Sequence, residues 1–141
     1  MAFVRPNLAT CTGCRFCEVV CSFNKSQSCD PFTSRIRIKK DEVNGVEEPV
    51  VCRQCGDPKC AQACPTGALA KDEVSGIVVY DKAQCILCGL CVEACPWGAI
   101  WLDSRDDIIL KCDLCGGDPA CVKYCPTKSL EIMELPESNQ V

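Results

Sequence analysis

Short runs of alternating apolar and polar residues along the chain predict small β-hairpins. Residues 35–40 read RIRIKK and residues 46–51 read VEEPVV, and the Asn44-Gly45 pair between them is a strong signal for a hairpin turn. Residues 99–103 and 107–111 predict a further hairpin in the same way. The segment KDEVNGV at positions 40–46 recurs as KDEVSGI at positions 71–77, which indicates a chain made of two duplicated halves.

Cysteine dominates the composition, since it occupies 17 of the 141 positions. Sixteen of the cysteines fall into four quartets with nearly repeated spacing, and Cys29 stands outside them. The quartets are Cys11, Cys14, Cys17 and Cys21; Cys52, Cys55, Cys60 and Cys64; Cys85, Cys88, Cys91 and Cys95; and Cys112, Cys115, Cys121 and Cys125. Because a C-x2-C spacing is too short for a comfortable disulfide, four groups of four thiolates indicate metal centres.

The end of each quartet has the length of one helical turn. A proline follows the last cysteine of the second, third and fourth quartets, and we expect it to end that turn. The second and fourth quartets have a longer middle gap that contains Asp57-Pro58 and Asp118-Pro119. These pairs predict a helix with an aspartate N-cap and a proline at the first helical position.

Composition and charge restrict the functional classes. Apolar residues make up 48% of the chain, but this figure includes the cysteines, so the hydrophobic core is thin and needs metal bonds to hold it. The first ten residues carry no apolar signal core, and no apolar run reaches the roughly 18 residues of a membrane span. We therefore expect a cytoplasmic protein with no direct membrane insertion. A net charge of −4 with scattered basic residues argues against a nucleic-acid partner, and the lack of histidine weakens hydrolytic and zinc-catalytic interpretations.

Four segments carry a family resemblance: CTGCRFCEVVC, CRQCGDPKCAQACPTGAL, CILCGLCVEACPWGAI and CDLCGGDPACVKYCPTKSL. They resemble the four-cluster iron–sulfur electron-transfer subunits of molybdenum and tungsten oxidoreductases, hydrogenases and carbon monoxide dehydrogenases. In size the chain is most similar to the small polyferredoxin partners of tungsten aldehyde oxidoreductases. The resemblance implies four 4Fe-4S clusters, no catalytic residues, and an α+β fold of duplicated bacterial ferredoxin-like two-cluster units with short hairpins and short helices.

The same resemblance implies that the last cysteine of each quartet binds a cluster of a paired quartet, outer with outer and inner with inner. The implied ligand sets are Cys11, Cys14 and Cys17 with Cys125; Cys112, Cys115 and Cys121 with Cys21; Cys52, Cys55 and Cys60 with Cys95; and Cys85, Cys88 and Cys91 with Cys64. We accordingly expect one compact domain over residues 1–134. It would consist of an outer module of residues 1–30 and 105–134 and an inner module of residues 46–104, followed by a flexible tail at 135–141.

Four thiolates per cluster leave no iron open to substrate, so we expect a relay of single electrons rather than catalysis. The expected partners are a large catalytic oxidoreductase subunit and a second redox protein. The catalytic subunit would be a molybdenum or tungsten enzyme, such as an aldehyde oxidoreductase or formate dehydrogenase. Alternatives are a freely diffusing ferredoxin, a subunit of a hydrogenase or carbon monoxide dehydrogenase, and a zinc-stapled interaction module.

Several residues near the quartets suggest further hypotheses. Trp97 and Trp101 are expected to pack over the inner clusters and strands. Cys29 is expected to be a small partly buried residue or a free thiol rather than a ligand in place of Cys21. Most basic side chains next to ligands are expected to be only solvated, and a minority to raise a neighbouring cluster's potential electrostatically. These basic residues are Arg15, Arg53, Lys59 and Lys111.

Overall fold

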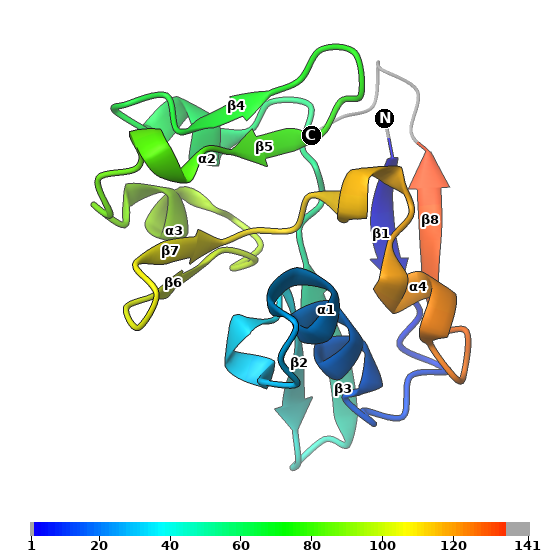
Figure 1. Cartoon of the computed structure of the whole chain (residues 1–141). Helices are drawn as coiled ribbons and strands as arrows, with labels where there is room; N and C mark the ends of the chain where they lie inside the picture. Colours follow the sequence, from blue (N-terminus) through cyan, green and yellow to red (C-terminus); the bar gives the residue numbers. More distant parts are fainter. Residues whose placement is uncertain (1, 135–141) are drawn as a thin grey trace.

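The computed structural model describes residues 2–134, which form a mixed fold of short helices and two-stranded antiparallel sheets (Figure 1). The strands are β1 (Ala2–Pro6), β2 (Ile36–Asp41), β3 (Val46–Val51), β4 (Leu69–Lys71), β5 (Val78–Tyr80), β6 (Trp101–Asp103), β7 (Ile108–Leu110) and β8 (Leu130–Glu134). The helices are α1 (Phe16–Ser26), α2 (Lys59–Ala63), α3 (Leu90–Ala94) and α4 (Ala120–Tyr124). The expected α+β class with short hairpins is thus confirmed, whereas the expected flexible tail lies outside the described residues.

The hairpins that the alternating pattern predicts are present. In the β2–β3 hairpin Ile36 pairs with Val51, and both side chains are buried. The turn is held by the Asp41 carboxylate, whose Oδ1 accepts the backbone N–H groups of Val43 at 3.1 Å and Asn44 at 3.2 Å. The KDEVSGI segment turns in a related way between β4 and β5, and β6 pairs with β7 as a third sequential hairpin.

The fourth sheet joins the two ends of the described chain and has no signal in the hydrophobic pattern. Strand β1 pairs antiparallel with β8, so that Val4 lies opposite Ile132 (Figure 1). Val4 is completely buried in this position. The backbone N–H of Asn7 then donates to the carbonyl oxygen of Ser129 at 2.6 Å. The first and fourth cysteine quartets are therefore held side by side.

The short helices end where the Cys-Pro pairs predict. Cys64, Cys95 and Cys125 each occupy the C-cap position in extended conformation, immediately before a proline. The first quartet differs because serine follows Cys21, and α1 continues to Ser26. A proline that cannot continue the helix therefore limits three of the four helices to little more than one turn.

The predicted aspartate N-caps are wrong. Pro58 and Pro119 themselves occupy the N-cap positions of α2 and α4 in extended conformation, so these helices begin one residue later than expected. The Asp57 carboxylate instead accepts hydrogen bonds from the ammonium group of Lys59 at 2.7 Å and from the Gln62 side chain. The fixed φ of proline suits the cap position as well as the first helical position, because both lie near −65°.

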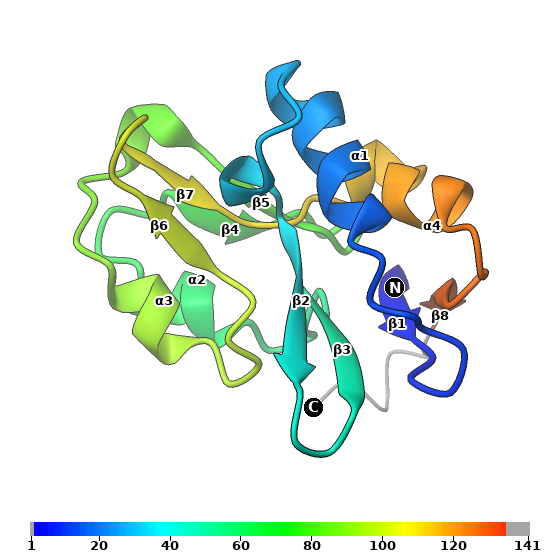
Figure 2. The ribbon, with the colours of Figure 1, turned by 90° about the horizontal axis from the view of Figure 1, so that it is seen from below.

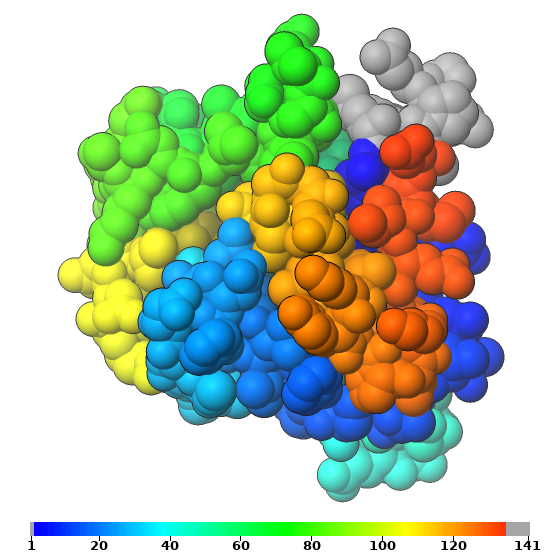
Figure 3. All heavy atoms as spheres, turned by 45° about the vertical axis from the view of Figure 1, so that its right-hand side comes forward, coloured from blue at the N-terminus to red at the C-terminus, as the bar shows by residue number. Residues whose placement is uncertain are grey.

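The helices pack in two pairs. Helix α1 lies against α4 and helix α2 lies against α3, as the view from below shows (Figure 2). The space-filling view shows residues near the two chain ends, including those of α1 and α4, in contact across one face (Figure 3). Aliphatic side chains such as Ile36, Ile100 and Ile109 are buried together with cysteines in two core clusters. Within residues 2–134, no helix combines the length and the apolar character that crossing a membrane requires.

Candidate metal centres

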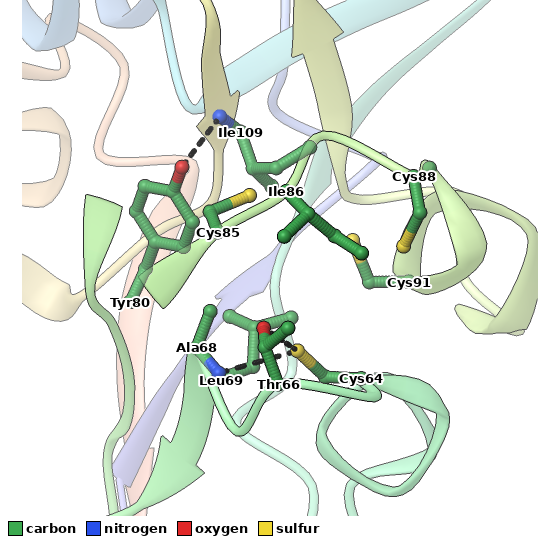
Figure 4. A pocket seen from close by; sticks show the side chains of 11 residues that line it. Cys64, Thr66, Ala68, Leu69, Tyr80, Cys85, Ile86, Cys88, Cys91 and Ile109 are labelled. Atoms are coloured by element: carbon green, nitrogen blue, oxygen red, sulfur yellow. Dashed lines mark hydrogen bonds between the residues drawn. The ribbon is translucent and has the colours of Figure 1, made fainter. Parts of the chain in front are cut away.

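One cavity of about 310 Å³ is lined by Cys64, Cys85, Cys88 and Cys91 (Figure 4). Cys85 and Cys88 belong to the loop before α3 and Cys91 to its first turn, whereas Cys64 follows α2 and reaches the cavity from the opposite side. Apolar side chains, including those of Leu69 and Ile109, complete the wall. Three cysteines of one quartet and the last cysteine of another therefore face the same space.

Two further cavities repeat this composition. One, of about 320 Å³, is lined by Cys52, Cys55, Cys60 and Cys95, together with Trp97 and Lys111 among others. The other, of about 310 Å³, is lined by Cys21, Cys112, Cys115 and Cys121. The structure thus brings together the members of three of the four ligand sets that the family resemblance implies.

The remaining set, Cys11, Cys14, Cys17 and Cys125, lies where the two ends of the chain meet. Cys17 lies in the first turn of α1, and Cys11 and Cys14 belong to the loop immediately before this helix. Cys125 ends α4, the helix that packs against α1, and both Cys17 and Cys125 are buried in the same core cluster. The Thr10 hydroxyl, one residue before Cys11, lies 3.0 Å from the hydroxyl oxygen of Ser129.

The backbone around the quartets repeats a pattern of N–H donors to sulfur. The first cysteines of the second, third and fourth quartets each accept the N–H two residues later, at 3.4 Å; the donors are Gln54, Leu87 and Leu114. All three donors have left-handed backbones, with φ between 47° and 58°, which is uncommon for residues other than glycine. The strained turn folds the chain back so that the amide points at the sulfur.

The last cysteines of the same quartets accept a second kind of hydrogen bond. Cys64, Cys95 and Cys125 each accept the N–H four residues later, from Ala68, Ala99 and Ser129, at 3.2 to 3.5 Å. Hydrogen bonds to the charged form of an acid favour that form, so these amides stabilise thiolates over thiols. Thiolates and not thiols bind metals, so the local backbone is arranged for metal-ligating cysteines.

The donor set fits a cluster of several metal ions. Within residues 2–134, no three cysteine, aspartate or glutamate side chains are close enough to hold one ion together. The sulfur atoms instead surround cavities with apolar walls, and backbone amides point at the sulfurs. Four thiolate ligands with N–H···S hydrogen bonds are what a 4Fe-4S cluster requires.

Comparison with known proteins agrees with this chemistry. Residues 43–135 match the family of the 4Fe-4S dicluster domain, and residues 8–24 match a 4Fe-4S binding domain. The chain belongs to the 4Fe-4S dicluster family. Its cofactors are 4Fe-4S clusters, and the sixteen quartet cysteines provide for four of them. The zinc-stapled interpretation loses its basis, because both matched families are defined by iron–sulfur binding.

Several known relatives of this dicluster protein are subunits of oxidoreductases. The chain is 40% identical over 129 residues to the polyferredoxin-like subunit of aliphatic sulfonate oxidoreductase from Pyrococcus furiosus, covering 92% of the chain and 74% of that subunit. It is 41% identical over 125 residues to subunit beta of NADH-dependent phenylglyoxylate dehydrogenase from Aromatoleum evansii, covering 87% of the chain but 28% of that subunit. In the active-site complex BamBC of benzoyl coenzyme A reductase, one chain superposes with a TM-score of 0.56 and 26% identity, over 94% of this chain and 79% of that one.

Burial sets the pKa of the core thiols. It raises the pKa of Cys17 and Cys112 to about 12 and that of Cys60 to about 11. Burial also acts on Cys64, but hydrogen bonds from the backbone N–H groups that follow and from the Thr66 hydroxyl outweigh it and lower the pKa to about 7. A buried thiolate is stable only beside positive charge, which the iron ions of a bound cluster supply.

The structure also adds residues that the sequence does not single out. The Asn24 side chain donates from Nδ2 to Cys115 Sγ at 3.3 Å, across 91 residues of chain. Gln54 is 2% exposed and lies between the second and fourth quartets. Asn24 follows the first quartet and Gln54 lies within the second, but both side chains form a hydrogen bond with the fourth quartet. The spacing of the cysteines therefore contains no signal for either side chain. Cys29 is exposed, and Trp97 lines a cysteine cavity while half of its surface faces solvent.

Proposed function

We propose that this chain is a non-catalytic electron-transfer subunit that passes single electrons through four 4Fe-4S clusters between a catalytic oxidoreductase subunit and a second redox protein. The observation that carries the proposal is the set of cysteine-lined cavities, each with four thiolate ligands available. A cluster with four thiolates has no open iron for a substrate. When bound, such a cluster accepts and releases one electron, and the apolar walls of this chain keep water away from it.

The proposed ligand sets are the crossed sets named above. Their support is that Cys95 lines the cavity of the second quartet, Cys64 that of the third and Cys21 that of the fourth. Each packed helix pair then serves two clusters: α1 and α4 carry or adjoin the last ligands of the outer sets, and α2 and α3 those of the inner sets. This arrangement supports two duplicated ferredoxin-like modules within one domain. The limits of the inner module at residues 46 and 104 fall within the hairpins β2–β3 and β6–β7, so these two hairpins connect the inner module to the rest of the domain.

The exposure of the ligands supports a linear relay. Cys14 and Cys88 are the exposed cysteines among the sixteen ligands, and they belong to different sets at the two ends. The sets of Cys112 and Cys52 contain no exposed cysteine and lie in the middle, where Gln54 links their first cysteines. Electrons would therefore enter near one exposed ligand, cross the two buried centres, and leave near the other.

The partner class follows from the relatives. Aliphatic sulfonate oxidoreductase, formate dehydrogenase and thiosulfate reductase each have a relative of this chain as a named subunit. We propose a molybdenum or tungsten enzyme as the catalytic partner and a cytoplasmic location, where thiols stay reduced for cluster assembly. A hydrogenase or carbon monoxide dehydrogenase partner and a freely diffusing ferredoxin are the outcomes that the experiment below distinguishes.

Anaerobic purification of the chain from its native host tests the function. We expect about sixteen iron and sixteen sulfide per chain, and a large pterin-containing subunit in the same complex. With the relay removed, electron delivery from substrate to the external acceptor should stop, while the partner should still reduce an artificial dye directly. Zinc without sulfide would contradict the cluster assignment, and an iron-loaded chain that purifies alone would support the ferredoxin alternative.

A further inference from the structure

Lys111 is a buried lysine between two of the cysteine-lined cavities. The whole residue is 6% exposed. Its ammonium group donates three hydrogen bonds. The acceptors are the carbonyl oxygen of Val78 at 2.7 Å, the carbonyl oxygen of Cys112 at 2.8 Å and Gln54 Oε1 at 3.3 Å. These three bonds use the three protons of the ammonium and fix its position.

All three acceptors are neutral, so the hydrogen bonds leave the charge uncompensated. The ion pairs found within residues 2–134 do not include Lys111. A buried ammonium without a nearby negative charge is strongly unfavourable. Lys111 lines the cavity of Cys52, Cys55, Cys60 and Cys95, and it directly precedes Cys112, a lining residue of the neighbouring cavity. A cluster with its four thiolates carries about −2, which supplies the missing negative charge on both sides.

Gln54 holds this ammonium and connects the two cavities. Its side chain donates from Nε2 to the carbonyl oxygen of Cys112 at 2.7 Å and accepts the N–H of Val78 at 3.0 Å. Its backbone N–H points at Cys52 Sγ at 3.4 Å. One residue thus contacts the first cysteine of the second quartet and the first cysteine of the fourth.

The other basic neighbours of ligands are in a different environment. Arg15 has a side chain 48% exposed and pairs with Glu18 at 3.2 Å, while Lys59 has a side chain 56% exposed and pairs with Asp57 at 2.7 Å. Arg53 stacks over the half-exposed ring of Trp97 at 5.0 Å. Solvent and partner carboxylates screen exposed charges, whereas a buried charge acts at low dielectric.

We propose that the fixed positive charge of Lys111 raises the reduction potential of the two middle clusters. The effect is strongest on the cluster held by Cys52, Cys55, Cys60 and Cys95. One electron from a mediator takes that centre from about −2 to about −3 without a proton, and the fixed ammonium stabilises the more negative state. The buried centres in the middle of the relay are thereby kept reducible although burial alone would oppose added negative charge. This inference rests on the proposed ligand sets and function.

The test is a potentiometric titration of the full anaerobic chain, followed by EPR, in wild-type protein and in Lys111→Met. Loss of the signal in Cys95→Ser identifies the centre concerned. In Lys111→Met we expect at least a tenfold fall in the reduced-to-oxidised ratio of that centre at fixed poise, equal to about 59 mV for one electron. Lys111→Arg keeps the charge and should stay within threefold of wild type. Lys59→Met removes an exposed lysine charge at the same cavity and should also change the ratio less than threefold.

Measurements of iron content and thermal stability distinguish an effect of Lys111 on the reduction potential from an effect on the folding of the chain. If Lys111→Met loses iron, the variant Gln54→Glu is measured in its place. This variant keeps the backbone and places a carboxylate beside the Lys111 ammonium. It should lower the reduction potential of the same centre. An iron-replete Lys111→Met with unchanged potentials would overturn the inference, as would an equal shift in Lys111→Arg or Lys59→Met. Loss of iron in both Lys111→Met and Gln54→Glu would also overturn it, by placing Lys111 in folding. Fewer than four centres in wild-type protein would instead contradict the proposed function.

Discussion

The crossed ligand sets make a sharp prediction for Cys125→Ser. Cys125 lies in the fourth quartet by sequence, but the Asn7–Ser129 and Thr10–Ser129 hydrogen bonds hold its loop beside the first quartet. The crossed model therefore predicts that Cys125→Ser removes the cluster built on Cys11, more than one hundred residues away in sequence. A model in which each quartet holds its own cluster predicts loss of the centre built on Cys112.

The expected magnitude is the loss of one centre in four, from about sixteen irons to about twelve. The fold should survive this loss. The two hydrogen bonds to Ser129 contribute about 1 kcal/mol each, and the β1–β8 pairing, with Val4 fully buried, does not depend on Cys125. A stable protein with three centres is therefore the predicted product.

Double variants make the assay independent of spectral assignment. Substitutions of two cysteines that serve one cluster should have non-additive effects on the number of centres, because the second substitution acts on a centre already lost. Cys11→Ser combined with Cys125→Ser should retain three centres by EPR spin counting and iron analysis, and Cys112→Ser combined with Cys125→Ser should retain two. The opposite result, two centres in the first pair and three in the second, would refute the crossed sets.

Four further predictions follow from the same geometry. Cys52→Ser should remove one cluster while Cys29→Ser leaves about sixteen irons, measured by iron analysis, because Cys29 lies exposed outside the quartets. Chelation with oxidation should abolish the native circular dichroism, because cysteines form part of both core clusters. Asn24→Leu should lower the potential of the Cys115 centre in a redox titration, by less than Lys111→Met, since it removes one N–H···S bond. Ile36→Ala, at a residue 1% exposed, should destabilise the chain by about 2–5 kcal/mol in denaturant-induced cluster bleaching, whereas Val74→Ala, at a residue 97% exposed, should change it by less than about 0.5 kcal/mol.

The local parts of the fold were predictable because short-range chemistry specifies them. The Asn44-Gly45 turn, the alternation before it and the Cys-Pro helix ends are each determined within about ten residues. The N-cap at Asp57 was predicted wrongly because this residue has a competing use: its carboxylate accepts hydrogen bonds from Lys59 and Gln62 rather than from the helix N–H groups. Local propensity identified the helices and their C-terminal ends, but not the residues at the N-caps of α2 and α4.

The long-range parts could not be predicted from the pattern. Strands β1 and β8 are five residues each, and neither alternates clearly enough to indicate a strand. Their paired residues Pro6 and Leu130 are 124 positions apart in the sequence. The environment of Lys111 is also non-local, since its acceptors Val78 and Gln54 lie 33 and 57 residues away. Sequence identified it as one of four basic neighbours of ligands, and burial distinguishes it from the other three.

The repeated backbone pattern has a consequence for how the clusters can differ. Quartets two to four receive the same pair of amide donors, two residues after the first cysteine and four after the last. In the crossed sets each inner cluster receives both kinds of donor, so these hydrogen bonds cannot order the two inner potentials. The set of Cys112 differs, because Cys21 Sγ accepts the N–H of Arg35 at 3.3 Å instead. Differences must come from what is not repeated: the exposure of Cys14 and Cys88 at the ends, the Asn24 side chain at Cys115, and the buried charge of Lys111 in the middle. In the proposed relay these few single side chains are therefore where substitutions should change electron flow without removing a cluster.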